Sequence, residues 1–288
     1  MSWNDPAAQI VLPLAAGWLF ILGGVVGSFL NVVAWRVPAG MSVLWPGSHC
    51  PKCQTPIRWY DNLPILGWLK LRGRCRACHA AISPRYPLVE AVAACLFLAI
   101  GGAEFVASGW NLPERVLVLP DGVITPLRGA PELAAITAYH LVLVSTLLAA
   151  ALIEFDRKAV PLKVFVPALV VGIVGPVLLG EFLRPVPGGL RFWPALTDGL
   201  LGAAAGGAVS AGDAWARRRW GGPMAAVCVG LYLGWQACAA ILLVSAALVV
   251  ASRLWRRVPL SIAVAVVTPA WLLSWSWLVA KLPMLALG

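Results

Sequence analysis

Charged residues are scarce in this sequence, and acidic residues are the scarcest. Asp and Glu number 12 and Lys and Arg 22 in 288 residues, so 12% of the chain is charged while 60% is hydrophobic. Soluble globular domains have about a quarter of their residues charged. So little polar surface cannot cover a soluble core of this length, which excludes the soluble globular class.

Other features are also missing. The chain has no internal repeat or low-complexity tract, and its first apolar stretch lacks the small-residue cleavage pattern of a secretory signal peptide. We therefore expect that stretch to be retained as a membrane span. Outside residues 34–86, no segment is polar enough to form a separate soluble domain.

The sequence contains several long apolar stretches. Seven of them approach the length of about 20 residues that a transmembrane helix needs. They cover 10–33, 87–108, 132–153, 164–182, 195–215, 224–251 and 258–279. We expect the sixth to form two short helices joined near Gln236, because this returns Arg253, Arg256 and Arg257 to the side of the other basic loops. The prediction is an all-α polytopic membrane protein of about eight transmembrane helices, with both termini outside.

The net charge of +10 is concentrated in one loop. Residues 34–86 carry eight basic residues and a single acid, Asp61. In a soluble protein such a cluster would indicate nucleic-acid binding. In a polytopic membrane protein the positive-inside rule favours a cytoplasmic loop instead. We therefore predict contact with membrane lipid and no nucleic-acid partner.

Two CxxC pairs, CPKC and CRAC, lie in this loop 21 residues apart. They consist of Cys50, Cys53, Cys75 and Cys78. Such pairs can place four thiolates around one ion, usually zinc, and a reducing cytoplasm favours metal over disulfides. His49 and His79 flank the pairs and could each replace a ligand, although solvated loop histidines are commoner. A site closed by four thiolates has no open catalytic position, so catalysis by the metal itself is not expected.

Several strings around these cysteines match a known family pattern. They are GSFLNVVAWRVP, SHCPKC, RWYDNLPILGWL, RGRCRAC and ISPRYPLVE, within residues 27–92. The chain thereby resembles the bacterial prepilin peptidases, the bifunctional type IV leader peptidase/N-methyltransferase family. The resemblance implies an eight-span enzyme of the bacterial inner membrane with a cytoplasmic active side.

The resemblance also implies substrates and cofactors. Members cleave the leader from type IV prepilins and type II secretion pseudopilins, and then methylate the new N-terminus with S-adenosylmethionine. The cysteine loop is associated with methylation and with zinc. No glycine-rich loop follows a strand here, so S-adenosylmethionine rests on the resemblance alone. The expected regions are a first transmembrane helix at 1–33, the cytoplasmic four-cysteine loop at 34–86, and a peptidase-like helical domain at 87–288.

The peptidase activity of this family requires two aspartates, because one carboxylate activates water while the other donates a proton. The first follows the pattern D-x-D-x-x-x-x-P-D. Here Glu154 takes the place of the first aspartate and Leu162 that of the last. The second aspartate ends a GxGD motif, and counting back from the string LGWQ at 233–236 places it on Gly222. The usual pair of aspartates therefore cannot form.

Two other acids could act with Glu154. Asp156 is two residues away and would point to another face of a helix. Asp213 lies nine residues before Gly222, about 13 Å along a continuous helix, and pairing with Arg217 is the competing explanation. The candidate catalytic residues are Glu154, Asp156 and Asp213.

Three functions are compatible with the sequence. The first is a methylation-type member of the family with lost or weakened peptidase activity. The second is a fully active bifunctional enzyme that pairs Glu154 with Asp213 or Asp156. The third is a non-catalytic pseudopeptidase that binds prepilins or assists assembly.

Overall fold

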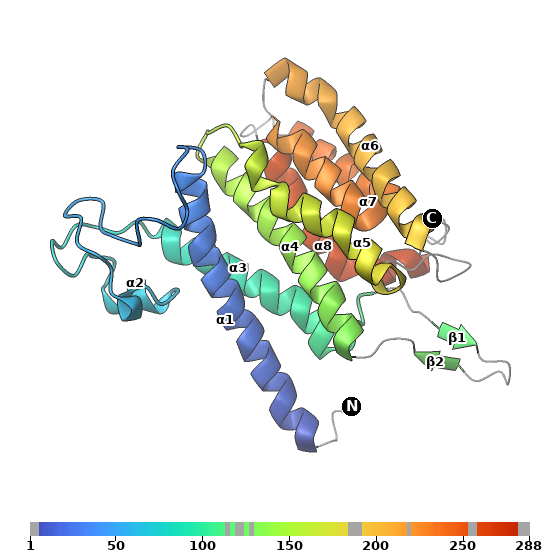
Figure 1. Ribbon diagram of the computed structural model, residues 1–288, viewed down its shortest axis with the longest axis horizontal. Helices are drawn as coiled ribbons and strands as arrows, with labels where there is room; N and C mark the ends of the chain where they lie inside the picture. Colours follow the sequence, from blue (N-terminus) through green and yellow to red (C-terminus); the bar gives the residue numbers. More distant parts are fainter. Residues whose placement is uncertain are drawn as a thin grey trace. The chain divides into compact units, whose positions relative to one another are not determined.

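Helices make up most of the protein (Figure 1). The computed structural model describes residues 6–112, 116–118, 124–126, 130–183, 192–217, 220–252 and 258–281. The α-helices are α1 (Pro6–Arg36), α2 (Leu66–Lys70), α3 (Arg85–Gly101), α4 (Ala130–Phe155), α5 (Val166–Leu183), α6 (Phe192–Arg217), α7 (Gly221–Ser252) and α8 (Leu260–Lys281). Single turns form η1 (Trp59–Asp61), the π-type η2 (Gly102–Val106) and η3 (Leu162–Val164). Two short antiparallel strands are β1 (Val116–Val118) and β2 (Ile124–Pro126).

Four helical stretches in the described residues are long and apolar enough to cross a membrane. They are Gln9–Arg36, Arg85–Val106, Ala130–Phe155 and Gly221–Ser252, and two shorter apolar stretches are Val166–Leu178 and Leu260–Ser274. Large apolar side chains also lie on their outer faces, where Leu14 is 68% and Leu178 is 73% exposed. Such faces suit lipid rather than water. The predicted class, an all-α polytopic membrane protein, is confirmed.

Helix α7 is bent back on itself at Gly234. This residue has φ 83° and ψ 175°, which lies outside the helical region. The sulfur of Cys238 lies 3.5 Å from the carbonyl oxygen of Ala226, although twelve residues of continuous helix would separate them by about 18 Å. The break predicted near Gln236 is therefore confirmed two residues earlier. Counting α7 as two segments, the described residues contain eight long helical segments.

Small residues let α6 and α7 approach closely. A Cβ added to Gly230 would overlap the carbonyl oxygen of Gly202, and one added to Gly206 would lie 2.6 Å from the carbonyl oxygen of Ala226. Positions 202 and 206 are one helical turn apart and run antiparallel to 230 and 226. Close backbone approach through small residues is the usual packing mode of membrane helices.

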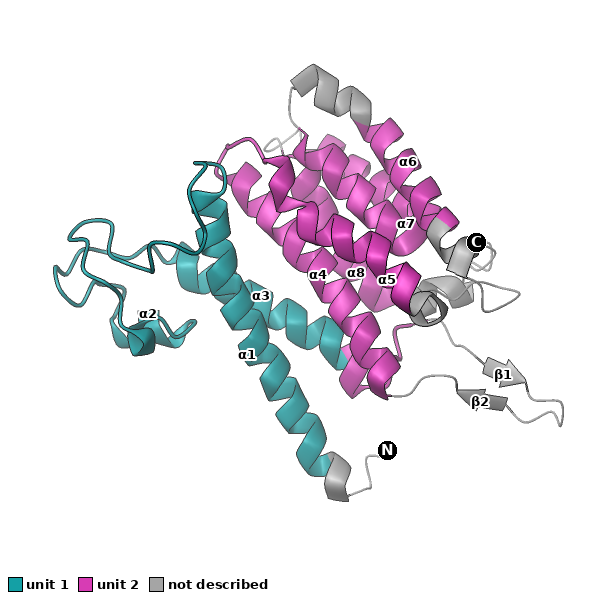
Figure 2. Ribbon diagram, viewed as in Figure 1, with its two compact units in different colours: residues 1–102 teal, residues 103–288 magenta. Residues whose placement is uncertain are grey.

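The chain forms two compact units, Met1–Gly102 and Ala103–Gly288 (Figure 2). In the first, α1 packs on α3 through Gly23 and Gly27, whose added Cβ atoms would lie 2.7 Å from the carbonyl oxygen of Ala93 and 2.8 Å from Cα of Glu90. In the second, α4 to α8 pack together around apolar side chains such as Ile153, which is fully buried. The functional division at residues 33 and 86 remains a prediction.

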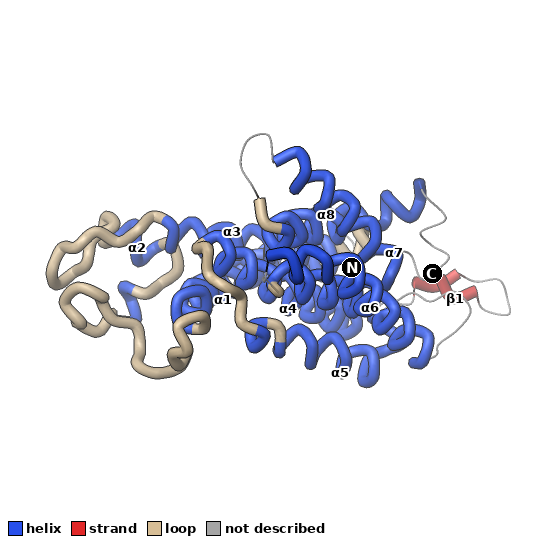
Figure 3. The backbone as a smooth tube through the Cα atoms, turned by 90° about the horizontal axis from the view of Figure 1, so that it is seen from above, coloured by secondary structure: helices blue, strands red, loops and turns tan. Residues whose placement is uncertain are grey.

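Between α1 and α3 the chain is mostly loop, with the short α2 as its one α-helix (Figure 3). The backbone hydrogen bonds inside this loop close local turns and do not form a β-ladder between strands. Its order therefore depends on a small number of specific contacts, and the cysteine turns provide several of them.

Candidate functional sites

The two CxxC pairs form two matching turns. In the first, the N–H of Cys50 donates to the carbonyl of Thr55 at 3.0 Å, and the N–H of Gln54 donates to the carbonyl of Cys50 at 2.9 Å. The second turn repeats this pattern at Cys75 and His79. Gln54 and His79 have φ values of 56° and 58°, the left-handed conformation that reverses the chain.

The four sulfur atoms gather at one point, all within 4.8 Å of one another. The sulfurs of Cys50 and Cys78 are 3.8 Å apart, and those of Cys53 and Cys75 are 3.9 Å apart. Thiolates bound tetrahedrally to zinc at 2.3 Å would be separated by about 3.8 Å. The four predicted cysteines therefore form a group that could hold a metal ion.

In the part of the chain that the structure describes, the flanking histidines His49 and His79 do not belong to the sulfur group. Nδ1 of His49 lies 2.9 Å from the carbonyl oxygen of Gly47, and His79 serves as the left-handed residue of the second turn. The gathered set consists of cysteines alone.

Hydrogen bonds prepare two of the cysteines for metal binding. Side-chain and backbone hydrogen bonds with Thr55 lower the pKa of Cys53 to about 6, and a backbone hydrogen bond from Cys78 lowers the pKa of Cys75. A backbone hydrogen bond from Ala80 acts in the same direction on Cys78, but the neighbouring sulfurs and burial together outweigh it and raise its pKa to about 11. A cation at the centre would favour the thiolate form of Cys78 and so offset the effect of the neighbouring sulfurs, because only the thiolate is a metal ligand.

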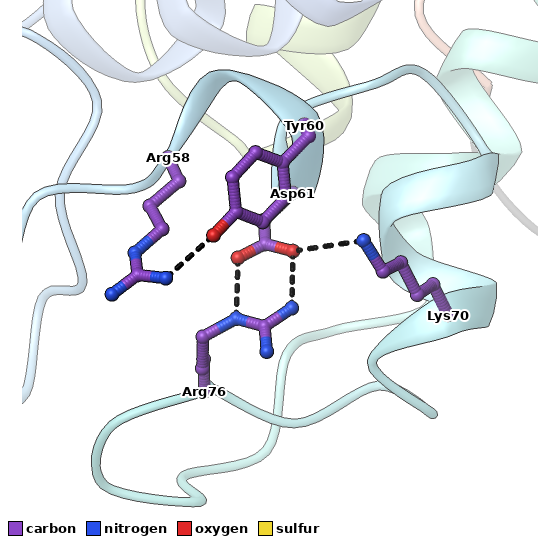
Figure 4. A network of polar contacts seen from close by, with 5 residues as sticks. All are labelled: Arg58, Tyr60, Asp61, Lys70 and Arg76. Atoms are coloured by element: carbon purple, nitrogen blue, oxygen red, sulfur yellow. Dashed lines mark hydrogen bonds and ion pairs between the residues drawn. The ribbon is translucent and has the colours of Figure 1, made fainter.

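Asp61, the single acid of the loop, ties the second cysteine turn to the preceding segment (Figure 4). Nε and Nη2 of Arg76 each donate to its carboxylate at 2.6 Å, and Nζ of Lys70 lies 3.8 Å away. Arg58 donates to the hydroxyl of Tyr60 at 2.5 Å, and Lys70 lies 4.6 Å from the centre of the Tyr60 ring. The pair is bidentate and therefore geometrically specific, and it is shielded from water on the Asp61 side only, since the Asp61 side chain is 4% exposed and that of Arg76 is 45% exposed.

Asp61→Asn is expected to loosen the loop. The Arg76 hydrogen bond holds the Asp61 pKa below its usual value, so the pair stabilises the fold above about pH 4 and this contribution is lost as the pH falls through the lower folded pKa. At neutral pH we expect several-fold faster amide hydrogen exchange across residues 58–76. Lys52→Ala, on the exposed side of the first cysteine turn, is the control. Equal exchange in the Asp61 variant and the wild type would contradict this role.

A second site lies where three helices of the other unit meet. Glu154, at the end of α4, is 5% exposed. Oγ of Ser261, at the start of α8, donates a hydrogen bond to its Oε2. At the start of α7, a Cβ added to Gly221 would lie 2.7 Å from its Oε1. The buried carboxylate of Glu154 thus lies between the Ser261 hydroxyl and Gly221.

The glycine that faces Glu154 is Gly221 and not Gly222, the residue at the predicted position of the second acid. A Cβ added to Gly222 would point at Leu260, 3.2 Å away. Neither glycine has a carboxylate, so the position opposite Glu154 on α7 supplies no acid. The residue that faces Glu154 in the structure therefore comes one position before the residue that the family pattern predicts.

The other two candidate acids are less well placed or less fully described. Asp156 lies in the turn after α4 and is partly exposed. Asp213 belongs to α6, but its side chain and that of Arg217 lie outside the described residues. The catalytic roles of Glu154, Asp156 and Asp213 remain predictions.

Sequence reasoning missed both Ser261 and Gly221. The only available signal for Ser261 was a hydroxyl in the first turn of an otherwise apolar predicted span. Its partner lies more than a hundred positions earlier in the chain. No local pattern connects two such residues.

These features define a class: a polytopic helical membrane protein with a four-cysteine group that could hold a metal ion and a buried carboxylate where three helices meet. Residues 21–103 match the family model described as Bacterial Peptidase A24 N-terminal domain. The chain is 32% identical over 275 residues to a prepilin leader peptidase/N-methyltransferase of Aeromonas hydrophila, covering 82% of this chain and 81% of that protein. The chain belongs to the prepilin leader peptidase/N-methyltransferase family.

Two further relatives match over a shorter length. A prepilin leader peptidase/N-methyltransferase of Myxococcus xanthus is 39% identical over 194 residues, 67% of this chain. A type 4 prepilin-like proteins leader peptide-processing enzyme of Escherichia coli is 44% identical over 130 residues, 39% of this chain. The matched region spans about half of each of these two relatives, 46% in both cases. No solved structure matches the chain.

Proposed function

We propose that this protein acts on type IV prepilins or type II secretion pseudopilins as a methylation-type member of its family, with lost or weakened leader cleavage. The observation that carries the proposal is the surroundings of Glu154. The position on α7 that faces its carboxylate is Gly221, and the family's second acid is absent there. Two close carboxylates divide the roles of base and acid because each shifts the pKa of the other. Gly221 has no side chain that could supply the second carboxylate of such a pair.

The cysteine loop supports the other half of the proposal. Its four sulfurs are spaced for a tetrahedral ion, and Cys50, Cys53, Cys75 and Cys78 would hold zinc there. A closed four-thiolate zinc site contributes order rather than a reaction step. We carry over S-adenosylmethionine as the methyl donor from the family, whose members are named N-methyltransferases.

We place the protein in the bacterial inner membrane with the cysteine loop in the cytoplasm. The support is the eight basic residues at positions 34–86 against one acid, together with the positive-inside rule. Cytoplasmic thiols are kept reduced, which suits four metal-binding cysteines.

Mass spectrometry of a co-expressed prepilin tests the cleavage half of the proposal, because it reports leader loss directly, together with any added CH₂. We expect the leader to be retained in cells containing this protein, and Glu154→Gln to leave that result unchanged. Leader loss that Glu154→Gln abolishes would instead establish an unconventional pair of acids. Pure metal-loaded protein is expected to transfer the methyl of labelled S-adenosylmethionine to a pre-cleaved pilin. A lack of transfer would exclude the methylation half.

A non-catalytic prepilin-binding role is the second candidate. It is favoured by Ser261, whose hydroxyl occupies Oε2 of Glu154, one of the two oxygens through which the carboxylate would activate water. Co-purification with an unprocessed prepilin of unchanged mass, without methyl transfer, would support this role over both enzymatic ones.

A further inference from the structure

Part of the cysteine loop lies alongside α1 and α3 rather than beyond their ends. A Cβ added to Gly24 would lie 3.2 Å from Cβ of Pro64, and the N–H of Ile65 donates to Oε2 of Glu90 at 2.6 Å. Gly24 precedes the last residue of α1, Arg36, by twelve positions, or about 18 Å of helix. The loop therefore folds back along the membrane helices.

The surplus length of α1 indicates where the hydrocarbon region ends. The helix has 31 residues, or about 46 Å, against a hydrocarbon thickness of about 30 Å. Polar contacts are found in its second half, where Ser28 hydrogen-bonds to Glu90 and Asn31 donates to the carbonyl of Tyr86. Since polar groups are costly in hydrocarbon, these contacts indicate that the interface begins in this half of α1, between Asn31 and Gly24, where the loop touches the helix.

The loop segment at this level has an apolar outer face. Leu63, Leu66 and Leu69 are 43%, 63% and 56% exposed, and Leu66 and Leu69 lie one turn apart on the same side of α2. The exposed cations Lys70, Arg72 and Arg74 follow directly. Exposed leucines beside a run of cations are typical of elements that lie in a membrane interface.

We propose that residues 63–70 rest in the interface of the membrane that holds α1 and α3. Leu63, Leu66 and Leu69 would insert at the boundary between headgroups and acyl chains, and the cations that follow would contact anionic headgroups. Lipid is the occupant because the contacts with Gly24 and Glu90 hold this face at the depth where lipid already surrounds the two helices. The inference does not depend on the reaction that the protein performs.

The backbone at Ile65 adopts an unusual conformation at the point where the loop meets α3. Its φ of 61° and ψ of −53° form a γ-turn, in which the N–H of Leu66 bonds to the carbonyl of Pro64 at 2.5 Å. Such a turn is rare and strained, especially for a β-branched residue. The N–H of Ile65 is not used within the turn and donates to the carboxylate of Glu90 instead. Glu90 therefore acts as the positioning residue.

Photolabelling from lipid tests this placement on the full chain. The protein is placed in nanodiscs of phosphatidylcholine and phosphatidylglycerol with a photoactivatable group near the top of one acyl chain, and labelled peptides are identified by mass spectrometry. We expect about fivefold more label on residues 63–69 than on the peptide containing Leu44. Leu44 is the internal control because it is 83% exposed but lies beyond the end of α1, where Arg36 donates to the carbonyl of Ser42.

Paired variants separate lipid contact from a folding defect. The double variant L66E/L69E is expected to lose most of the label while keeping its metal content, whereas Leu44→Glu changes neither. Glu90→Gln is expected to lower the label by weakening the hold on Ile65. Equal label at the two peptides, or none at 63–69, would overturn the proposal. So would a change in oligomeric mass in L66E/L69E with low lipid label in the wild type, because a protein would then cover the face.

Discussion

Replacing Cys75 with serine is expected to lower bound metal from about one ion per chain to below about a tenth of that, and to unfold the loop between α1 and α3. The loop has one five-residue α-helix and a single 3-10 turn, so it buries little apolar surface of its own. Metal binding in such segments supplies folding free energy, on the order of 10 kcal/mol or more. Losing one of four ligands removes most of it.

Elemental analysis of the purified protein and limited trypsin digestion measure the two effects. Lys52 and Arg58 lie inside the loop and become rapid cleavage sites once it unfolds. Cys95→Ser is the matched control, because Cys95 is exposed on α3 and stands outside the sulfur cluster. His79→Ala is expected to keep its metal. Full metal content in the Cys75 variant would show that the cluster binds no ion through four sulfurs.

Replacing Gly230 with alanine is expected to destabilise the helical unit by about 1–3 kcal/mol or more, because the added methyl has nowhere to go. It would overlap the backbone carbonyl of Gly202, and backbone cannot move aside as a flexible side chain can. The two helices would have to separate along the whole seam from Gly202 to Gly206. Close packing of this kind supplies much of the attraction between helices in lipid.

Unfolding in a mild detergent titrated with sodium dodecyl sulfate, followed by circular dichroism, measures this loss. The control is Gly17→Ala on α1, since a Cβ there would meet nothing within 4 Å. Alanine has a higher helix propensity than glycine, so the control is expected to be neutral or slightly stabilising. An unchanged midpoint for the Gly230 variant would mean that α6 and α7 are not in close contact at Gly202.

Part of the architecture could be predicted from local pattern. The break in the sixth apolar stretch follows from its length and from the basic residues after it, and the structure places it at Gly234. That glycine carries a positive φ, and an added Cβ would overlap the carboxylate of Asp198. The sequence could suggest a break but not this second requirement, because Asp198 belongs to another helix.

The carboxylate site shows where local pattern stops. Alignment pointed to Gly222, but the residue that faces Glu154 is Gly221. Each residue of an α-helix turns the side-chain direction by about 100°, so a shift of one position moves a side chain from one neighbour to another. Ser261 was missed for the same kind of reason, since its role depends on how the first turn of α8 is rotated against α4.

By itself the sequence determined the class of protein and its chemical inventory. Composition and run length define a membrane protein, CxxC spacing predicts a four-sulfur group, and Gly222, at the predicted position of the second acid, has no carboxylate. These conclusions depend on which residues are present and on short spacings, both of which can be read directly from the sequence. Only the tertiary structure decided that Gly221 and Ser261 meet Glu154, and that the segment after Leu63 lies beside α1 at Gly24. Such contacts depend on helix rotation, register and depth, which become fixed only when distant segments pack together.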